Sequence, residues 1–130
     1  MKEVTRQERG WAGHFICAKD CLFRRNTLLT CGDARIVVST VGLMLNALKG
    51  KGAGFEEDFS EIGYKRYYET MAFHSNSADT KYHDIDVTRE IRIDSNASIN
   101  VIDADVEANE MHEQVVEELT QKLANGEMKE

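Results

Sequence analysis

Residues 11–43 read WAGHFICAKDCLFRRNTLLTCGDARIVVSTVGL, and this stretch decides the fold. Three runs rich in apolar and β-branched side chains are separated by Lys19-Asp20 and Gly32-Asp33, pairs that suit tight connections between strands. The pattern therefore predicts an antiparallel meander. Its expected strands are residues 12–18, 21–31 and 35–43.

The third run of the meander is β-branched and suits a central strand that is covered on both faces. Val37 and Val38 are therefore both expected to be buried. The middle run differs, because alternation places Arg24 and Arg25 on opposite faces of a half-apolar strand. A buried arginine needs a carboxylate, a carbonyl or a ligand phosphate to offset its desolvation. Arg24, Arg25 and the neighbouring Asn26 are accordingly candidates for binding a small anion.

Composition bounds the class of protein. With 130 residues, 42% hydrophobic and 30% charged, the chain fits a single domain, residues 1–130. No run of about 18 apolar residues is present to span a bilayer, and the first ten residues lack the apolar segment of a signal peptide. We therefore expect no membrane partner and a cytoplasmic location, in which Cys17, Cys21 and Cys31 stay reduced.

The charge distribution argues against long nucleic acid as a partner. The formal net charge is -7; the acidic excess lies in residues 103–130, while residues 1–36 carry a small basic excess. A duplex-binding protein gains affinity by neutralising many phosphates, which this pattern does not offer. A small anionic ligand remains compatible with it.

Residues 44–63 break the strand pattern. The first of them have the composition of one or two helical turns, but Gly50, Gly52 and Gly54 follow so closely that residues 49–61 are expected to form a loop. This helix or glycine-rich loop insertion lacks the Gly-Lys-Ser/Thr ending of a P-loop. A mobile lid or a subunit contact is therefore favoured over a phosphate cradle.

Residues 64–74 form the next expected strand, which is rich in aromatic side chains and has no strand breaker. One face holds Tyr64, Arg66, Tyr68, Thr70 and His74. The other face holds Lys65, Tyr67, Glu69, Met71 and Phe73. Rings beside a guanidinium hold nucleobases by stacking and phosphates by paired hydrogen bonds. A solvated strand face with its tyrosine hydroxyls in water explains the pattern nearly as well.

A further strand is expected within residues 82–93, which completes the strands of residues 64–93. Its inward side chains are Ile85, Val87, Ile91 and Ile93. In a regular strand Arg89 would point to the same inward face. It therefore needs a partner there, unless a β-bulge turns it outward. Asp84 and Asp86 alternate on the same strand and could bind a divalent cation, but a charged strand edge is the favoured interpretation.

Residues 103–125 are expected to form a C-terminal helix, with Asp103 as N-cap and Gly126 as the stop. An apolar stripe recurs along it at steps of three and four residues. The stripe consists of Ala108, Met111, Val115, Leu119 and Leu123. It must pack on the sheet or on a second subunit, and we expect it to support self-association. Asn109 and His112 share one face near the helix start, where an anion is favoured. The alternative is that both are exposed polar positions.

His14, Cys17 and Cys21 have side chains that zinc accepts, but their spacing argues against a zinc site. On an extended strand His14 and Cys17 face opposite ways, and no paired Cys-x2-Cys is present. Buried thiols without metal or disulfide are therefore favoured. A cysteine nucleophile would need Cys17 or Cys31 beside His14 or His74, and nothing in the sequence pairs them.

The chain resembles the phage-encoded anti-Thoeris proteins in four runs between residues 10 and 120. These are Gly10-Trp11-x-Gly13-His14-Phe15-Ile16-Cys17, Cys21-x-Phe23-Arg24-Arg25-Asn26-Thr27, Tyr67-Tyr68-Glu69-Thr70 and Asn109-x-Met111-His112. The resemblance implies a sponge that binds the cyclic ADP-ribose isomer made by a TIR enzyme of bacterial immunity and holds it without cleavage. It also implies an antiparallel sheet with two helices, and a dimer that can assemble into hexamers, with nucleotide bound where subunits meet. Some members of the family hold cyclic oligonucleotides in a separate site.

We therefore expect an α+β fold, with an antiparallel sheet of about five to six strands, a short helix or loop insertion and a long C-terminal helix. The expected function is to sequester a cyclic nucleotide immune signal, without catalysis, metal or cofactor, as a homodimer or hexamer in an infected bacterium. The alternatives are a small metal-dependent nuclease or phosphodiesterase and an oligomeric interaction protein without a small ligand. The candidate ligand-binding residues are Arg24, Arg25, Asn26, Arg66, Tyr67, Tyr68, Phe73, His74, Arg89, Arg92, Asn109 and His112.

Overall fold

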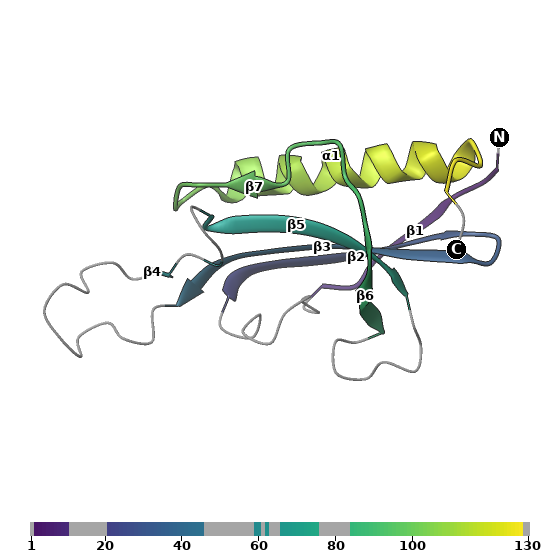
Figure 1. The fold of residues 1–130 in the computed structure, drawn as a ribbon. Coiled ribbons are helices and arrows are strands. Elements are labelled where there is room, and N and C mark those ends of the chain that lie inside the picture. The colour runs from purple at the N-terminus through teal and green to yellow at the C-terminus, as the bar shows by residue number, and fades with distance from the viewer. Residues whose placement is uncertain are drawn as a thin grey trace, which may run out of the picture.

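The computed structural model describes residues 2–10, 21–45, 59–60, 62, 66–75 and 84–128. Within them the chain has an α+β fold in two layers, an antiparallel sheet with one long helix along one face (Figure 1). The strands are β1 (Thr5–Glu8), β2 (Cys21–Cys31), β3 (Ala34–Leu45), β4 (Phe59–Ser60), β5 (Tyr68–Ser75), β6 (Ile85–Ile91) and β7 (Ser98–Ile99), and the helix is α1 (Asp105–Ala124). The sheet order is β1-β2-β3-β5-β6, with β4 beside β3 and β7 beside β5. The fold class is the one that the sequence predicts.

β2 and β3 form the long central pair of the sheet. β2 has the bounds predicted for it, whereas β3 extends beyond residues 35–43 at both ends. The extension replaces the start of the predicted helical turns with strand, because Met44 pairs with Cys21 of β2 and with Ser60 of β4. Backbone partners on both sides therefore override the local helical composition here.

The prediction that β3 is covered on both faces is confirmed. Val37 and Val38 are both fully buried, and their side chains belong to core clusters on opposite faces of the sheet. The predicted strand at residues 12–18 and most of the glycine-rich insertion, residues 46–58, lie outside the described part of the chain.

Residues 1–10 contain a strand, β1, for which the sequence offers no prediction. Thr5 to Glu8 pair antiparallel with Thr30 to Thr27 of β2. All four side chains of β1 are exposed, so the strand carries no apolar alternation that a sequence pattern could report. Its position depends on backbone pairing and, as shown below, on ion pairs.

β6 corrects the expectation that four aliphatic side chains share one buried face. Ile85 packs with Phe73 on the face away from α1, whereas Ile91 belongs to the core beneath α1. The register between β5 and β6 shifts between Phe73 and Ser75, and such an irregularity reverses which side chains point to each face. Val87 is consequently 36% exposed rather than inward, and Arg89 is exposed.

The apolar stripe of α1 packs against the sheet. Ala108, Met111, Val115, Leu119 and Leu123 are all buried. The C-terminal part of the stripe joins Leu29, Ile36 and Val38 in one core cluster, and the N-terminal part joins Phe23 and Tyr68 in another. Burying one such side chain contributes about 1.5–3 kcal/mol. Because the sheet already covers the stripe, the stripe does not support self-association, contrary to our expectation.

The start of α1 also differs from the prediction. The N-cap is Ala104, without a side-chain cap, and Asp103 has a φ of 57° instead of capping the helix. The hydroxyl of Tyr68 instead anchors the residues at the helix start, since it accepts the Ala104 amide at 3.0 Å and donates to Asp105 Oδ1 at 2.7 Å. Gly126 follows the helix with a φ of 72°, as expected for a helix stop.

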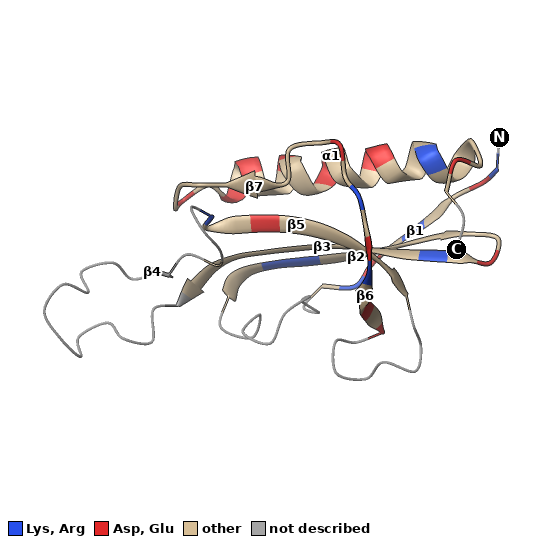
Figure 2. Ribbon diagram, in the orientation of Figure 1, with Lys and Arg blue, Asp and Glu red and all other residues tan. Residues whose placement is uncertain are grey.

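The outer face of α1 is strongly acidic (Figure 2). Its exposed acids include Asp105, Glu107, Glu110 and Glu117. Among the described residues no helix has the length and apolar content that crossing a bilayer requires.

Candidate functional site

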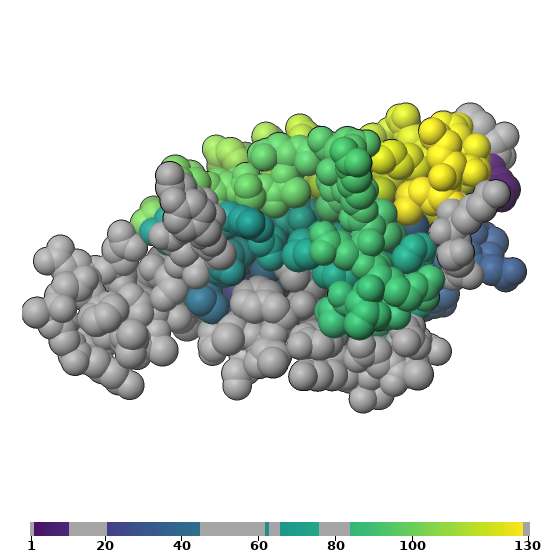
Figure 3. Space-filling model, in the orientation of Figure 1, coloured from purple at the N-terminus to yellow at the C-terminus, as the bar shows by residue number. Residues whose placement is uncertain are grey.

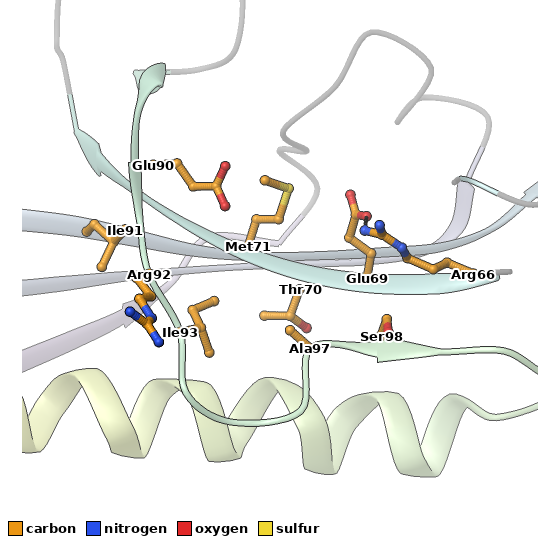
Figure 4. Close-up of a pocket in the computed structure, with 10 residues that line it drawn as sticks. All are labelled: Arg66, Glu69, Thr70, Met71, Glu90, Ile91, Arg92, Ile93, Ala97 and Ser98. Carbon is orange, nitrogen blue, oxygen red and sulfur yellow. Dashed lines mark hydrogen bonds and ion pairs between the residues drawn. The ribbon is translucent and has the colours of Figure 1, made fainter. Parts of the chain in front are cut away.

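A groove with a volume of about 470 Å³ opens beside β5 where its neighbour changes from β7 to β6 (Figure 4). β5 pairs with β7 at Tyr68–Glu69 and with β6 from Ala72 onward. Residues 92–97 leave the sheet between these pairings and return where Ala97 accepts the backbone N–H of Thr70 at 2.9 Å. The groove is lined by Arg66, Glu69, Thr70, Met71, Glu90, Ile91, Arg92, Ile93, Ala97 and Ser98.

The groove combines an apolar lining with charged side chains. Arg66 forms an ion pair with Glu69 at 2.7 Å, whereas the side chain of Arg92 is 94% exposed and lies 3.8 Å from Asp94. Figure 4 shows the two arginines at opposite ends of the groove. Volumes of about 300–1,000 Å³ and an apolar lining with a few polar groups are typical of small-molecule sites. The groove therefore has the size and chemistry to hold a flat apolar ring together with an anionic group.

Arg25 and Asn109 meet on the side of the sheet that faces α1. Arg25 donates through Nε and Nη2 to Glu8 Oε1 at 3.0 and 2.9 Å. Its Nη1 lies 2.9 Å from Glu113 Oε2 and 3.4 Å from Asn109 Oδ1. Arg6 donates to both carboxylate oxygens of Glu113 at 2.7 and 2.6 Å. We call Arg6, Glu8, Arg25 and Glu113 the β1–α1 ion-pair cluster.

The acids of the ion-pair cluster neutralise its arginines. Hydrogen bonds from Arg6, opposed by partial burial and reinforced by Arg25, lower the pKa of Glu113 to about 2. Burial acts to raise the pKa of Glu8, but hydrogen bonds from Thr27 and Arg25 hold it below its usual value. Both carboxylates are therefore charged at neutral pH, and an anionic ligand would have to displace them to reach Arg25.

His112 is fully buried between α1 and the sheet, within a chain of hydrogen bonds. Its Nε2 lies 2.7 Å from Thr27 Oγ1, and its Nδ1 lies 2.7 Å from Thr40 Oγ1. Thr27 donates to Glu8 Oε2 at 2.8 Å, and the hydroxyls of Thr40 and Thr70 are 2.6 Å apart. An ionised carboxylate only accepts, so Thr27 must donate to Glu8 and accept from Nε2–H, which leaves Nδ1 as the acceptor for Thr40.

The protonation state of His112 follows from its burial. Desolvation of the ring lowers its pKa to about 4, and the charge of Arg25 acts in the same direction. The neutral imidazole is therefore a buried bridge between α1 and the strands rather than an exposed ligand for an anion.

The arginines of the predicted site do not converge on one point. Arg66 and Arg92 line the groove, while Arg89 is exposed on β6 and Arg24 is partly buried on β2. Asn26 is fully buried, and its Oδ1 accepts the Nε–H of Arg9 at 2.8 Å. Arg9 is not among the predicted ligand-binding residues. The structure thus gathers Arg66 with Arg92 in the groove, and Arg25 with Asn109 and His112 beneath the helix.

The predicted aromatic residues lie in or beside the core. Tyr68 is 0% exposed, and its ring meets that of Phe23 edge-on, with centroids 5.6 Å apart and an interplanar angle of 77°. Phe73 is 2% exposed on the opposite face of the sheet. Tyr67 and His74 are partly buried. None of these four described residues lines the groove.

Asp84 and Asp86 are held by neighbouring side chains. Asp84 Oδ2 lies 3.0 Å from Arg9 Nη1 and accepts the hydroxyl of Ser75 at 2.8 Å. Asp86 Oδ1 accepts both the amide and the hydroxyl of Thr88, at 3.1 and 2.6 Å. In the described ranges no group of three or more His, Cys, Asp and Glu side chains is arranged to hold a metal ion.

The side chains of Cys21 and Cys31 are buried, with exposed fractions of 2% and 8%. Cys31 lies 3.8 Å from the carbonyl oxygen of Leu123, at the C-terminal end of α1. His14 and Cys17 lie outside the described residues, so the structure places only part of the zinc candidate set.

The sequence did not indicate Glu8 and Glu113 of the ion-pair cluster, or Ala97 and Ser98 of the groove. Glu8 and Glu113 carry no motif, and only the folded pairing of β1 with β2 beneath α1 brings them to Arg25. Ala97 and Ser98 line the groove because β7 pairs with β5 across a long loop, and a two-residue strand gives no periodic signal.

Comparison of the chain with protein-family models, with curated proteins and with solved structures finds no match.

Proposed function

We propose that the chain is a binding protein that holds a small anionic nucleotide in the groove between β5, β6 and β7. The observation that carries the proposal is one groove that presents two guanidinium groups, Arg66 and Arg92, beside apolar side chains, with the carboxylates of Glu69 and Glu90 also in its lining. Fork-shaped guanidinium groups match phosphate oxygens, and an apolar lining accepts a nucleobase face.

The ligand proposed is a cyclic ADP-ribose isomer, which the resemblance to anti-Thoeris proteins supports. Such a molecule carries two phosphates and one adenine, so it offers a charged and a flat part to the two kinds of surface in the groove. Binding without cleavage would remove the signal from bacterial antiphage defence in the cytoplasm of an infected host. Cyclic oligonucleotides, which present the same phosphates and bases, are the second ligand class.

A phosphate that binds in the groove must compete with the carboxylates that already contact Arg66 and Arg92. Arg66 is engaged by Glu69 at 2.7 Å, so a phosphate must compete with that carboxylate. Arg92 is exposed, and its contact with Asp94 is longer, at 3.8 Å. We therefore assign the first phosphate contact to Arg92, because an exposed pair contributes little and is easily exchanged.

The direct test of a sponge is depletion followed by intact release. The cyclic ADP-ribose isomer, prepared from NAD with a TIR-domain enzyme, is incubated with the protein, and the protein is then removed by heat. Loss of free ligand before heating and recovery of the unchanged nucleotide afterwards support the proposal. A converted product would indicate an enzyme, and undiminished free ligand would indicate an interaction protein without this ligand.

Self-association, as a dimer or hexamer, is proposed on a surface other than the buried stripe of α1. Val101, Ile102 and Val106 are 58%, 45% and 67% exposed and lie within six residues of sequence at the start of α1. Exposed aliphatic side chains gathered at one place are typical of contact surfaces. Replacing Val106 with Asp should lower the mass measured by sedimentation while the chain stays folded. An unchanged mass in the folded variant would place the contact elsewhere.

A further inference from the structure

One wall of the groove is attached to α1 by a carboxylate. Residues 92–97 join β6 to β7 and contribute Arg92, Ile93 and Ala97 to the lining. In the space-filling view the residues that follow β6 stand over β5 and reach the helix (Figure 3). The position of this segment therefore sets the width of the groove on that side.

Glu118 of α1 receives four hydrogen bonds. Its Oε2 accepts the amide of Asp94 at 2.8 Å, and its Oε1 accepts the amide and hydroxyl of Ser95 at 2.8 and 2.5 Å. Lys122 Nζ donates to Glu118 Oε2 at 3.1 Å and to Asp94 Oδ2 at 3.0 Å. Although burial acts against it, the amide donors lower the pKa of Glu118 to about 2. The carboxylate therefore stays charged and holds two consecutive amides.

Besides the amide bonds to Glu118, the segment is fixed by the Lys122–Asp94 ion pair and by the bond from the Thr70 amide to Ala97. The side chains of Arg92, Asp94 and Asn96 are exposed, and Ile93 is only partly buried against the core. The two amides bonded to Glu118 belong to Asp94 and Ser95, which directly follow Arg92 and Ile93. Because bonds to a charged acceptor are about twice as strong as neutral ones, the amide bonds to Glu118 contribute more to the placement of the segment than the neutral backbone bond at Ala97.

We propose that Glu118 is a positioning residue for nucleotide binding, which holds residues 92–97 so that Arg92 and Ile93 face the ligand. The inference rests on the proposed function of the groove. It adds that α1 controls the affinity for the nucleotide through Glu118, whose side chain is 13% exposed. The coupling is reciprocal. If the bonds from the Asp94 and Ser95 amides to Glu118 favour nucleotide binding, then bound nucleotide must stabilise those bonds.

The first test compares Glu118→Gln with Glu117→Gln in calorimetric titrations with the cyclic ADP-ribose isomer. The glutamine keeps the length of the side chain but places an amide donor where two N–H groups need acceptors. Residues that position a site without touching the ligand typically change affinity by about 3- to 30-fold, and we expect a loss in that range for Glu118→Gln. Glu117 is exposed and accepts from Gln121 only within α1, so Glu117→Gln should bind like the parent.

Rescue and exchange measurements separate positioning from a merely structural role. Ser95→Ala should weaken binding, and Ser95→Thr, which keeps the hydroxyl, should restore it. In the parent protein, saturating nucleotide should slow hydrogen exchange of the Asp94 and Ser95 amides, whereas a structural role predicts no dependence on ligand. This measurement needs no variant, so it holds even where Glu118→Gln fails to fold.

The outcomes distinguish the two proposals. A parent protein that binds neither the cyclic ADP-ribose isomer nor a cyclic oligonucleotide overturns the proposed function and this inference with it. A parent that binds, with equal affinity in folded Glu118→Gln and ligand-independent exchange at Asp94 and Ser95, overturns the role of Glu118 alone.

Discussion

Nε2 of His112 lies 2.7 Å from the hydroxyl of Thr27, so the buried face of α1 is hydrogen-bonded to the central strands of the sheet. The Thr27 hydroxyl in turn donates a hydrogen bond to Glu8 of β1. On the other side of the ring, Thr40 and Thr70 continue it into β3 and β5. One neutral histidine thereby joins the helix to four strands, and the ionised end at Glu8 fixes the direction of the hydrogen bonds.

Removing this ring should destabilise the protein. His112→Ala leaves the hydroxyls of Thr27 and Thr40 without their buried partner and opens a void, so we expect the free energy of unfolding to fall by about 2–4 kcal/mol. Urea unfolding measures it. Gln114→Ala, at an exposed position of the same helix, should change it by less than about 0.5 kcal/mol. Equal stabilities of the two variants would contradict the role assigned to His112.

Stability should also depend on pH through His112. Its pKa is about 4 in the folded protein against an ordinary value of 6.5. Between these values the unfolded chain binds a proton that the folded chain does not, so the free energy of unfolding falls as pH falls. The full contribution, about 3 kcal/mol, is present above pH 6.5 and is lost towards pH 4.

The measurement is a series of urea unfolding curves between pH 4 and pH 7.5. His112→Asn should lose most of the slope in this window, while Gln114→Ala, at an exposed position that does not titrate, should keep it. The account of the buried ring fails if the slope persists undiminished in the His112 variant.

Leu119 tests whether the stripe of α1 packs within one chain. It is 0% exposed in the core beneath the helix, so Leu119→Ala should lower the free energy of unfolding by about 2–5 kcal/mol at any protein concentration. Gln114→Ala, at an exposed position of the same helix, serves as the control. A destabilisation that disappears at high protein concentration would show that the stripe is instead a subunit contact.

Arg25 distinguishes the ion-pair cluster from the ligand site. Its side chain is 20% exposed and paired with Glu8 and Glu113, so Arg25→Met should cost about 1 kcal/mol of stability, as measured by thermal unfolding. The affinity for the cyclic ADP-ribose isomer should not change, because Arg25 does not line the groove. A tenfold loss of affinity in the folded variant would move the site to the cluster.

The sequence predicts those parts of the fold that periodicity determines. The bounds of β2, the burial of Val37 and Val38 and the buried stripe of α1 all follow from alternation or from steps of three and four residues. β1 and β7 were not predictable in this way, because a polar edge strand and a two-residue strand are formed by backbone pairing with distant partners.

The same distinction applies to the candidate site. Arg66 and Arg92 were identified by their chemistry, but their common groove depends on where residues 92–97 leave the sheet. Tyr68 has an aromatic ring that could stack on a base, yet the ring is buried. Gly42, its partner on β3, leaves room for the ring, and a Cβ at Gly42 would overlap it. Burial against a glycine is a property of strand register, which local composition does not report.

The most direct test of the groove is a calorimetric titration of the cyclic ADP-ribose isomer into the parent and three arginine variants. The account predicts that Arg66→Ala and Arg92→Ala each weaken binding by about tenfold or more, since each removes a charged contact to phosphate. Arg35→Ala, at an exposed arginine that lines no part of the groove, should bind like the parent. Parent-like affinity in folded Arg66→Ala and Arg92→Ala would contradict the account.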